Sequence, residues 1–152
     1  MKISIRSTPI AAAVVIGLWS GAAAATTLIA DDEAKVPDSP PEVRTRGISR
    51  GPAVAFEEPR AGVVEHAPFE FKVKLEAHGG AAINPAKLRV TYLKTPSIDL
   101  TERLRPFVTA QGIDMPAAEV PAGEHLLRIE VEDSDGRATQ TTITLSAAKR
   151  SP

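Results

Sequence analysis

The sequence contains no cysteine among its 152 residues. Without cysteine a protein has no disulfide and cannot be anchored through a lipidated cysteine, so its stability must come from a packed core. Aromatic residues are also scarce, with one tryptophan, one tyrosine and four phenylalanines. Sugar-binding sandwiches generally stack sugar rings on exposed aromatic side chains, and this scarcity argues against such a platform.

The chain has no excess of basic residues, since its formal net charge at pH 7 is −1. Nucleic-acid binding and attachment to an anionic membrane both need a basic surface, so the composition excludes these two classes of partner. Arg44, Arg46 and Arg50 do cluster, but in a proline-flanked segment. Such a cluster is more typical of a solvated tail than of a site for an acidic partner.

Long apolar runs are missing as well. The stretch Ile10 to Ala25 carries no charge, follows Lys2 and Arg6, is rich in alanine and ends in small residues. A membrane span needs about 20 strongly apolar residues, whereas this pattern is typical of a secretory signal peptide. We predict a signal peptide over 1–25 with cleavage after Ala25, Ala30 being the second choice and an uncleaved anchor the alternative. A cleaved chain would be periplasmic or secreted and would have no membrane segment.

The segment after the predicted cleavage site is rich in proline and charge. Because it has few large apolar side chains to offset the entropy of ordering it, we predict a disordered tether over 26–51. A single domain is expected over 52–148, followed by a short tail over 149–152. Within the domain, Ala53 to Phe56 is expected to add a first edge strand.

From residue 61 onward the apolar residues recur with a period of two. In Phe69 to Glu76 the apolar and charged residues alternate strictly, and the alternation returns in Lys87 to Leu93 and in His125 to Glu132. Arg137 to Leu145 is rich in β-branched residues, with Ile143 and Leu145 expected on the buried side. Alternation of this kind predicts half-buried strands. The sequence therefore indicates an all-β fold, an antiparallel sandwich of about seven strands.

One stretch has a different pattern. Leu100 and Leu104 are four residues apart, Asp99 and Glu102 fit a helix start, and Pro106 fits an end. We predict one short helical turn there, crossing from one sheet to the other. Residues 112–123 are expected to form a short, interrupted strand and a corner, with Ile113 and Met115 as apolar contacts.

The stretch Pro121 to Leu145 combines Pro-Ala-Gly, an alternating strand, an acidic turn with glycine and a threonine-rich last strand. It resembles the last hairpin of bacterial immunoglobulin-like domains and of related PKD-like and fibronectin-III-like modules. The opening at 57–71 is similar to their first strands. The resemblance implies an immunoglobulin-like sandwich of an exported protein. The tryptophan and cysteines of antibody-type domains are absent, so only the architecture is carried over.

Asp133 and Asp135, followed by Gly136, could form either a calcium loop or a hairpin turn. If Gly136 is aligned with the invariant glycine of an EF-hand, the opening ligand position holds Val131 and the closing glutamate position holds Thr142. Both essential ligands are missing. We therefore predict a hairpin connection in which Gly136 adopts a positive φ, with the two aspartates as weak metal candidates.

No other group of residues indicates a metal site or catalysis. His66, His78 and His125 lack the short spacing that aims two imidazoles at one ion. Copper carriers built as small sandwiches tend to present an N-terminal histidine and clustered methionines, whereas the mature chain would start at Thr26 and keep only Met115. The serines lack a nucleophile motif, and Glu130 and Glu132 alternate with Arg128 as on a solvated sheet face.

We therefore expect an exported, non-enzymatic module without a cofactor. It would act through protein contact or as a structural accessory domain, and an exposed sheet edge could recruit an extended partner strand without any special residue. The alternative is a periplasmic protein that binds a metal ion or a carbohydrate.

Overall fold

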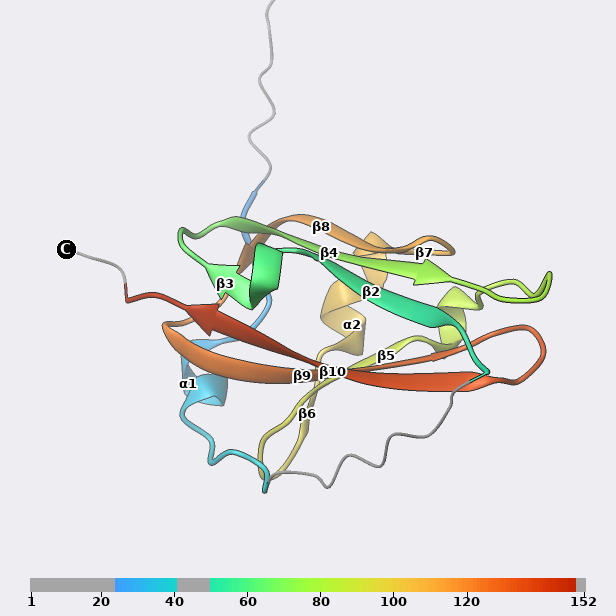
Figure 1. Ribbon diagram of the computed structural model, residues 1–152. Helices are drawn as coiled ribbons and strands as arrows, with labels where there is room; N and C mark the ends of the chain where they lie inside the picture. Colours follow the sequence, from blue (N-terminus) through green and yellow to red (C-terminus); the bar gives the residue numbers. More distant parts are fainter. Residues whose placement is uncertain (1–23, 41–49, 150–152) are drawn as a thin grey trace, which may run out of the picture.

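A computed structural model describes residues 24–40 and 50–149, which form two five-stranded sheets packed face to face (Figure 1). The first sheet has the order β1-β8-β4-β2, with β7 also paired to β8, and the second has the order β3-β10-β9-β5-β6. The strands of the first sheet are β1 (Thr26–Thr27), β2 (Ala53–Glu58), β4 (Phe69–Glu76), β7 (Val108–Thr109) and β8 (Gly112–Glu119). Those of the second are β3 (Val63–Val64), β5 (Arg89–Tyr92), β6 (Ile98–Asp99), β9 (Gly123–Glu132) and β10 (Ala138–Ala147).

Helical elements are short. They are α1 (Asp31–Ala34), η1 (Arg60–Gly62), η2 (Pro85–Lys87), α2 (Thr101–Leu104) and η3 (Arg105–Phe107). The predicted helical turn is confirmed as α2, which leads from β6 of one sheet to β7 of the other and lies between the layers (Figure 1). Asp99 accepts a hydrogen bond from the Thr101 amide at 2.8 Å, as its expected position at the helix start implies. In the described part of the chain, no helix is long and apolar enough to cross a membrane.

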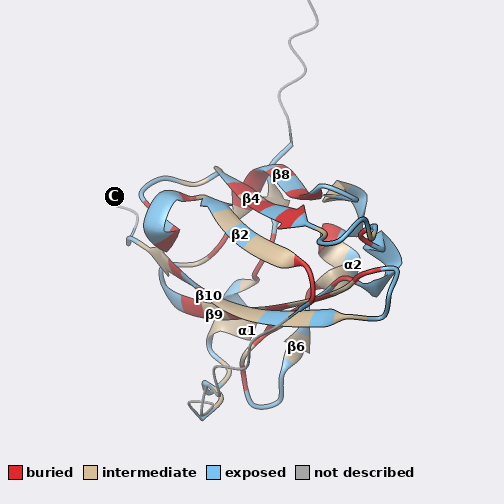
Figure 2. Cartoon of the chain, turned by 45° about the vertical axis from the view of Figure 1, so that its right-hand side comes forward, coloured by how far each residue is buried: buried red, intermediate tan, exposed pale blue. Residues whose placement is uncertain are grey.

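Strict alternation produces the predicted burial on β4. Phe71, Val73 and Leu75 are buried in the core, whereas Glu70 and Lys74 are exposed. Buried and exposed positions alternate along β4 in Figure 2. Phe69, at the end of the strand, is only partly buried and packs against the rim of the core. The core side of the other alternating strands is likewise buried, including Val90, Tyr92, Leu127, Ile129 and Leu145.

The expected strand count of about seven is corrected to ten in residues 24–40 and 50–149. Four of the strands, β1, β3, β6 and β7, are two residues long. Two residues are too few to display a period of two, so alternation in the sequence cannot reveal them.

The interrupted strand expected near Pro116 is in fact the eight-residue β8, which lies inside the first sheet. Its ladder with β4 pairs Phe69 with Ala118 and Phe71 with Met115, so Pro116 and Ala117 together oppose one residue of β4. This is a β-bulge, a place where a strand tolerates a proline that cannot donate to the ladder. Ile113 and Met115 are buried, as predicted.

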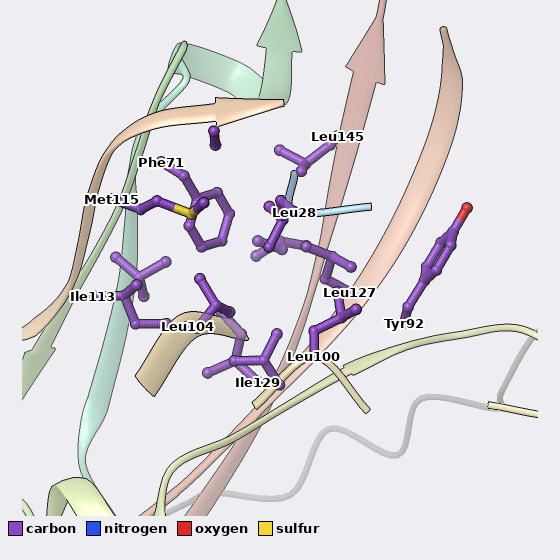
Figure 3. Packing of buried hydrophobic residues seen from close by; sticks show 14 of the residues in the cluster. Leu28, Phe71, Tyr92, Leu100, Leu104, Ile113, Met115, Leu127, Ile129 and Leu145 are labelled. Atoms are coloured by element: carbon purple, nitrogen blue, oxygen red, sulfur yellow. The ribbon is translucent and has the colours of Figure 1, made fainter. Parts of the chain in front are cut away.

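Residues 26–40 are not the mobile tether that their composition predicts. Thr26 and Thr27 pair in parallel with Ala118 and Glu119 of β8, and the next two residues, Leu28 and Ile29, are almost completely buried. The Leu28 side chain lies inside the apolar cluster near Leu127 and Leu145 (Figure 3). Leu28 and Ile29 thus provide the apolar surface that residues 31–40 lack. The rest of the predicted tether, 41–49, and most of the signal peptide, 1–23, lie outside the described residues.

The hairpin predicted around Gly136 is confirmed. β9 and β10 pair antiparallel along their whole lengths, from Glu132 with Ala138 to Gly123 with Ala147. Gly136 has φ 75°, a left-handed conformation that favours glycine, and its amide donates to the Asp133 carbonyl at 3.0 Å. The turn fixes the register of β9 and β10. β9 begins at Gly123 and not at His125, and β10 ends at Ala147 and not at Leu145.

Candidate functional site

Three polar side chains are buried in the described part of the chain, Lys94, His125 and Asp133. They are the candidates for binding a ligand or taking part in a reaction. They lie in two places. Asp133 is in the β9–β10 turn. Lys94 and His125 belong to a cluster where the second sheet meets residues 26–39, a segment we call the strap.

The Asp133 carboxylate accepts hydrogen bonds from residues of its own turn. Its Oδ1 accepts hydrogen bonds from the amides of Asp135 and Arg137, and its Oδ2 accepts from Arg137 Nε at 2.9 Å. Burial by itself would raise the pKa of Asp133, but these hydrogen bonds outweigh it and hold the pKa below its usual range. Arg137 also pairs with Asp135 at 2.9 Å. A guanidinium therefore contacts both weak metal candidates, and their arrangement serves the hairpin.

His125 is fully buried with both ring nitrogens engaged. Its Nε2 lies 2.8 Å from the Pro121 carbonyl, and its Nδ1 lies 2.7 Å from the Tyr92 hydroxyl. Because a carbonyl can only accept, Nε2 must carry the hydrogen and Nδ1 must accept from Tyr92. Burial lowers the pKa of His125 below its usual value. The site holds one tautomer of a neutral imidazole.

Lys94 connects this pair to the strap. Its ammonium donates to Asp38 Oδ1 at 2.5 Å and to the Ala34 carbonyl at 3.1 Å, and it lies over the Tyr92 ring, 5.0 Å from the ring centroid. Burial by itself lowers the pKa of Lys94, but its interactions with Asp38 and Tyr92 outweigh burial and raise the pKa. Tyr92 stands at the end of the apolar cluster with its hydroxyl pointing outward (Figure 3). A chain of contacts thus runs from the strap to His125, through the Asp38–Lys94 ion pair, the Lys94 ammonium over the Tyr92 ring and the Tyr92–His125 hydrogen bond.

Backbone bonds fasten the same end of the strap. The Ser39 amide donates to the Leu93 carbonyl at 3.3 Å, and the Thr95 amide donates to the Pro37 carbonyl at 2.8 Å. Ser39 Oγ donates to the Lys94 carbonyl at 2.5 Å. The strap is therefore held to the second sheet by several polar contacts and to the first sheet by β1.

The remaining residues weighed from the sequence are not brought together. His66 and His78 are exposed, and Met115 is in the core. Residues 24–40 and 50–149 contain no group of three or more histidine or acidic residues that could hold a metal ion. Glu130 and Glu132 lie on the outer face of β9, where Glu130 is opposite Arg89 of β5 and Glu132 is 4.0 Å from Lys87.

The aromatic side chains offer no exposed ring within the described residues. Phe71 and Tyr92 are buried, and Phe56, Phe69 and Phe107 are partly buried against the core. The large apolar residue exposed there is Val63 of β3. A stacked sugar ring has no partner among these aromatic side chains.

Among the described residues, one strand edge has no pairing partner in its middle. β10 pairs with β9 on one side, and on the other with β3, through Ser146 and Ala147. At the hairpin the Asp133 amide donates to the Arg137 carbonyl, and antiparallel pairs alternate along the ladder. The backbone groups of Thr141 and Ile143 therefore face β9, whereas those of Gln140 and Thr142 point away from it.

Two glycines mark the ends of this opening. A Cβ on Gly51 would lie 2.8 Å from the Ala138 carbonyl oxygen, and a Cβ on Gly62 would lie 2.1 Å from that of Thr144. The chain therefore runs close against β10 at both places. Between them lies the stretch we call the β10 window, Gln140 to Ile143.

β10 lacks the residues that usually prevent another strand from pairing with an edge. No residue of β10 is charged, and none is a proline. By contrast, the edge strand β2, which the sequence predicted, carries a bulge next to Glu57 and stands between Pro52 and Pro59. Charges, prolines and bulges are the usual means of blocking an edge, and the other edge strands described are two residues long.

Comparison with known proteins gives one weak similarity. No protein-family model matches the sequence, and no curated protein matches it. Among solved structures, CopC from Methylosinus trichosporium OB3b is similar with a TM-score of 0.40 and 15% identity, over 59% of this chain and 85% of that one. A similarity at this level assigns no ligand or activity to the chain.

Proposed function

We propose that the chain is an exported, non-enzymatic immunoglobulin-like module that acts by protein contact, and that the contact is made at the β10 window. An extended segment of a partner would add to β10 as a further strand. The backbone groups of Gln140 and Thr142 would provide the affinity, and the side chains on the same strand would provide selectivity.

The strand order supports the immunoglobulin-like assignment. Immunoglobulin sandwiches place strands A, B, E and D in one sheet and C, F and G in the other. If β2, β4 and β8 correspond to A, B and E, and β5, β9 and β10 to C, F and G, the neighbours agree. The short β3, parallel to β10, then continues β2 in the second sheet. Modules of this architecture serve as spacers, adhesive units and accessory domains.

The observation that carries the contact proposal is the outward-pointing backbone at Gln140 and Thr142 on an uncharged, proline-free strand. Buried donors and acceptors are otherwise paired, and an edge that offers both without a blocking feature favours strand addition. The opening limits the partner to a short extended segment, because Gly51 and Gly62 bound it.

Photo-crosslinking in the cell tests this function. A photoreactive residue at position 142 should capture a distinct partner, and the same residue at position 70, on the outer face of β4, should not. Thr142→Pro should abolish binding of the captured partner, because it removes an outward amide and places a ring at the edge. Thr142→Lys, which leaves the backbone amide in place, should weaken it through edge charge. Identical adducts from both positions would contradict the proposal.

A further inference from the structure

We infer that the strap is an acid-responsive closure, in which protonation of His125 loosens its Asp38 end while the sandwich stays folded. The inference is independent of the β10 window. It rests on the chain of contacts that joins a buried imidazole to the strap through Tyr92 and Lys94.

The hydrogen-bond directions in the closed state allow one proton arrangement. The Tyr92 hydroxyl donates to His125 Nδ1, and the Lys94 ammonium lies over the ring of the same tyrosine, 5.0 Å from its centroid. If Nδ1 gains a proton it becomes a donor, and the Tyr92 oxygen must then accept from it. The hydroxyl hydrogen of Tyr92 would have to turn away from the imidazolium. Protonation thus reverses the Tyr92–His125 hydrogen bond and places a second positive charge on the same tyrosine that Lys94 contacts.

Few groups could compensate that charge. The side chains that face His125 are Tyr92 and Lys94, from β5 and the residues after it, and Asp38 from the strap. On the β10 side, His125 pairs with the uncharged Leu145. The single carboxylate, Asp38, is already engaged by Lys94 and its side chain is 68% exposed. Opening the strap relieves the strain because water then solvates both cations.

Hydrogen exchange at the strap provides the test. The amides of Ser39 and Thr95 bridge the strap and the second sheet, whereas the amide of Ile129 lies in the core strand β9. As the pH falls from about 6.5 toward 5, protection of the two strap amides should fall about ten-fold per pH unit while one proton is taken up. The Ile129 amide should stay protected throughout. Loss of Ile129 protection in step with the strap, or unchanged strap protection, would overturn the inference.

Two variants test whether His125 causes the pH dependence of strap protection. His125→Gln keeps an acceptor for Tyr92 and a donor for Pro121 but has no titration in this range, so strap protection should become independent of pH. The matched control, His66→Gln at an exposed position, should respond as the wild type does. Asp38→Asn removes the compensating carboxylate without altering the core, and the strap should open at a higher pH. If His125→Gln fails to fold, a wild-type opening midpoint in Asp38→Asn would still refute the mechanism.

Discussion

Arg103 holds Glu33 through two parallel hydrogen bonds of 2.6 Å each, and in this way ties α1 of the strap to α2 between the sheets. Arg103 also donates to the Leu28 carbonyl at 3.1 Å. Glu33 accepts a further bond from the Ala30 amide at 2.9 Å. This pair holds the middle of the strap, next to Ala34, whose carbonyl accepts from Lys94.

Glu33→Gln should therefore destabilise the protein. The carboxylate is mostly buried and bidentate, and loss of charge-assisted hydrogen bonds of this kind costs about 1 to 2 kcal/mol. Glu102→Gln is the matched control, since the Glu102–Arg105 pair is exposed and its loss should cost less than about 0.5 kcal/mol. Urea unfolding of the three proteins measures the difference. Equal free energies of unfolding would show that Glu33 does not anchor the strap.

The fall in the free energy of unfolding at acid pH should depend in part on the Glu33 carboxylate. The hydrogen bonds from Arg103 hold the pKa of Glu33 below its usual value. A lowered pKa in the folded state stabilises the protein above the unfolded value of about 4.3, and this stabilisation is lost as the pH falls through the folded pKa. Free energies of unfolding measured between pH 7 and 3 should converge for wild type and Glu33→Gln at the acid end. A constant difference across this range would exclude the linkage.

Leu28→Ala should be severely destabilising, although it lies in a segment that composition alone assigns to a tether. The side chain is fully buried in the core cluster, and truncation of a buried leucine costs about 2 to 5 kcal/mol. Thr27→Ala, next to it and exposed, should change stability by no more than about 0.5 kcal/mol. Thermal melts compare the two, and similar melting temperatures would mean that the strap contributes nothing to the core.

Some features of the fold and of the strap contacts could be predicted from the sequence, and others could not. Alternation predicted β4, β5, β9 and β10 because long strands with one buried face repeat every two residues. His125 and Lys94 are in phase with the inward-facing Leu127 and Tyr92, but neither was predicted from the sequence to be buried. Asp38, the partner of Lys94, lies 56 residues away in sequence, and no local pattern indicates such a contact. Leu28 and Ile29 form a single apolar pair, which is too short for a period.

Gly136 should be replaceable by asparagine far better than by valine. No atom lies within 4 Å of a Cβ at this position, so the cost comes from the backbone conformation at φ 75° and not from a clash. A β-branched residue in the left-handed region costs on the order of 1 to 2 kcal/mol, whereas asparagine adopts it readily. Denaturation of Gly136→Val and Gly136→Asn should therefore differ by about this amount. Equal stability of the two variants would contradict the turn assignment.

Hydrogen exchange along β10 is the most direct measurement of the central claim, that this strand offers an open edge for a partner. In the free protein, the amides of Thr141 and Ile143 should be protected by β9, and those of Gln140 and Thr142 should exchange rapidly. Addition of the captured partner should protect Gln140 and Thr142 and leave Thr141 and Ile143 unchanged. If Gln140 and Thr142 are already protected in the free protein, or stay unprotected with the partner bound, β10 is not the contact edge.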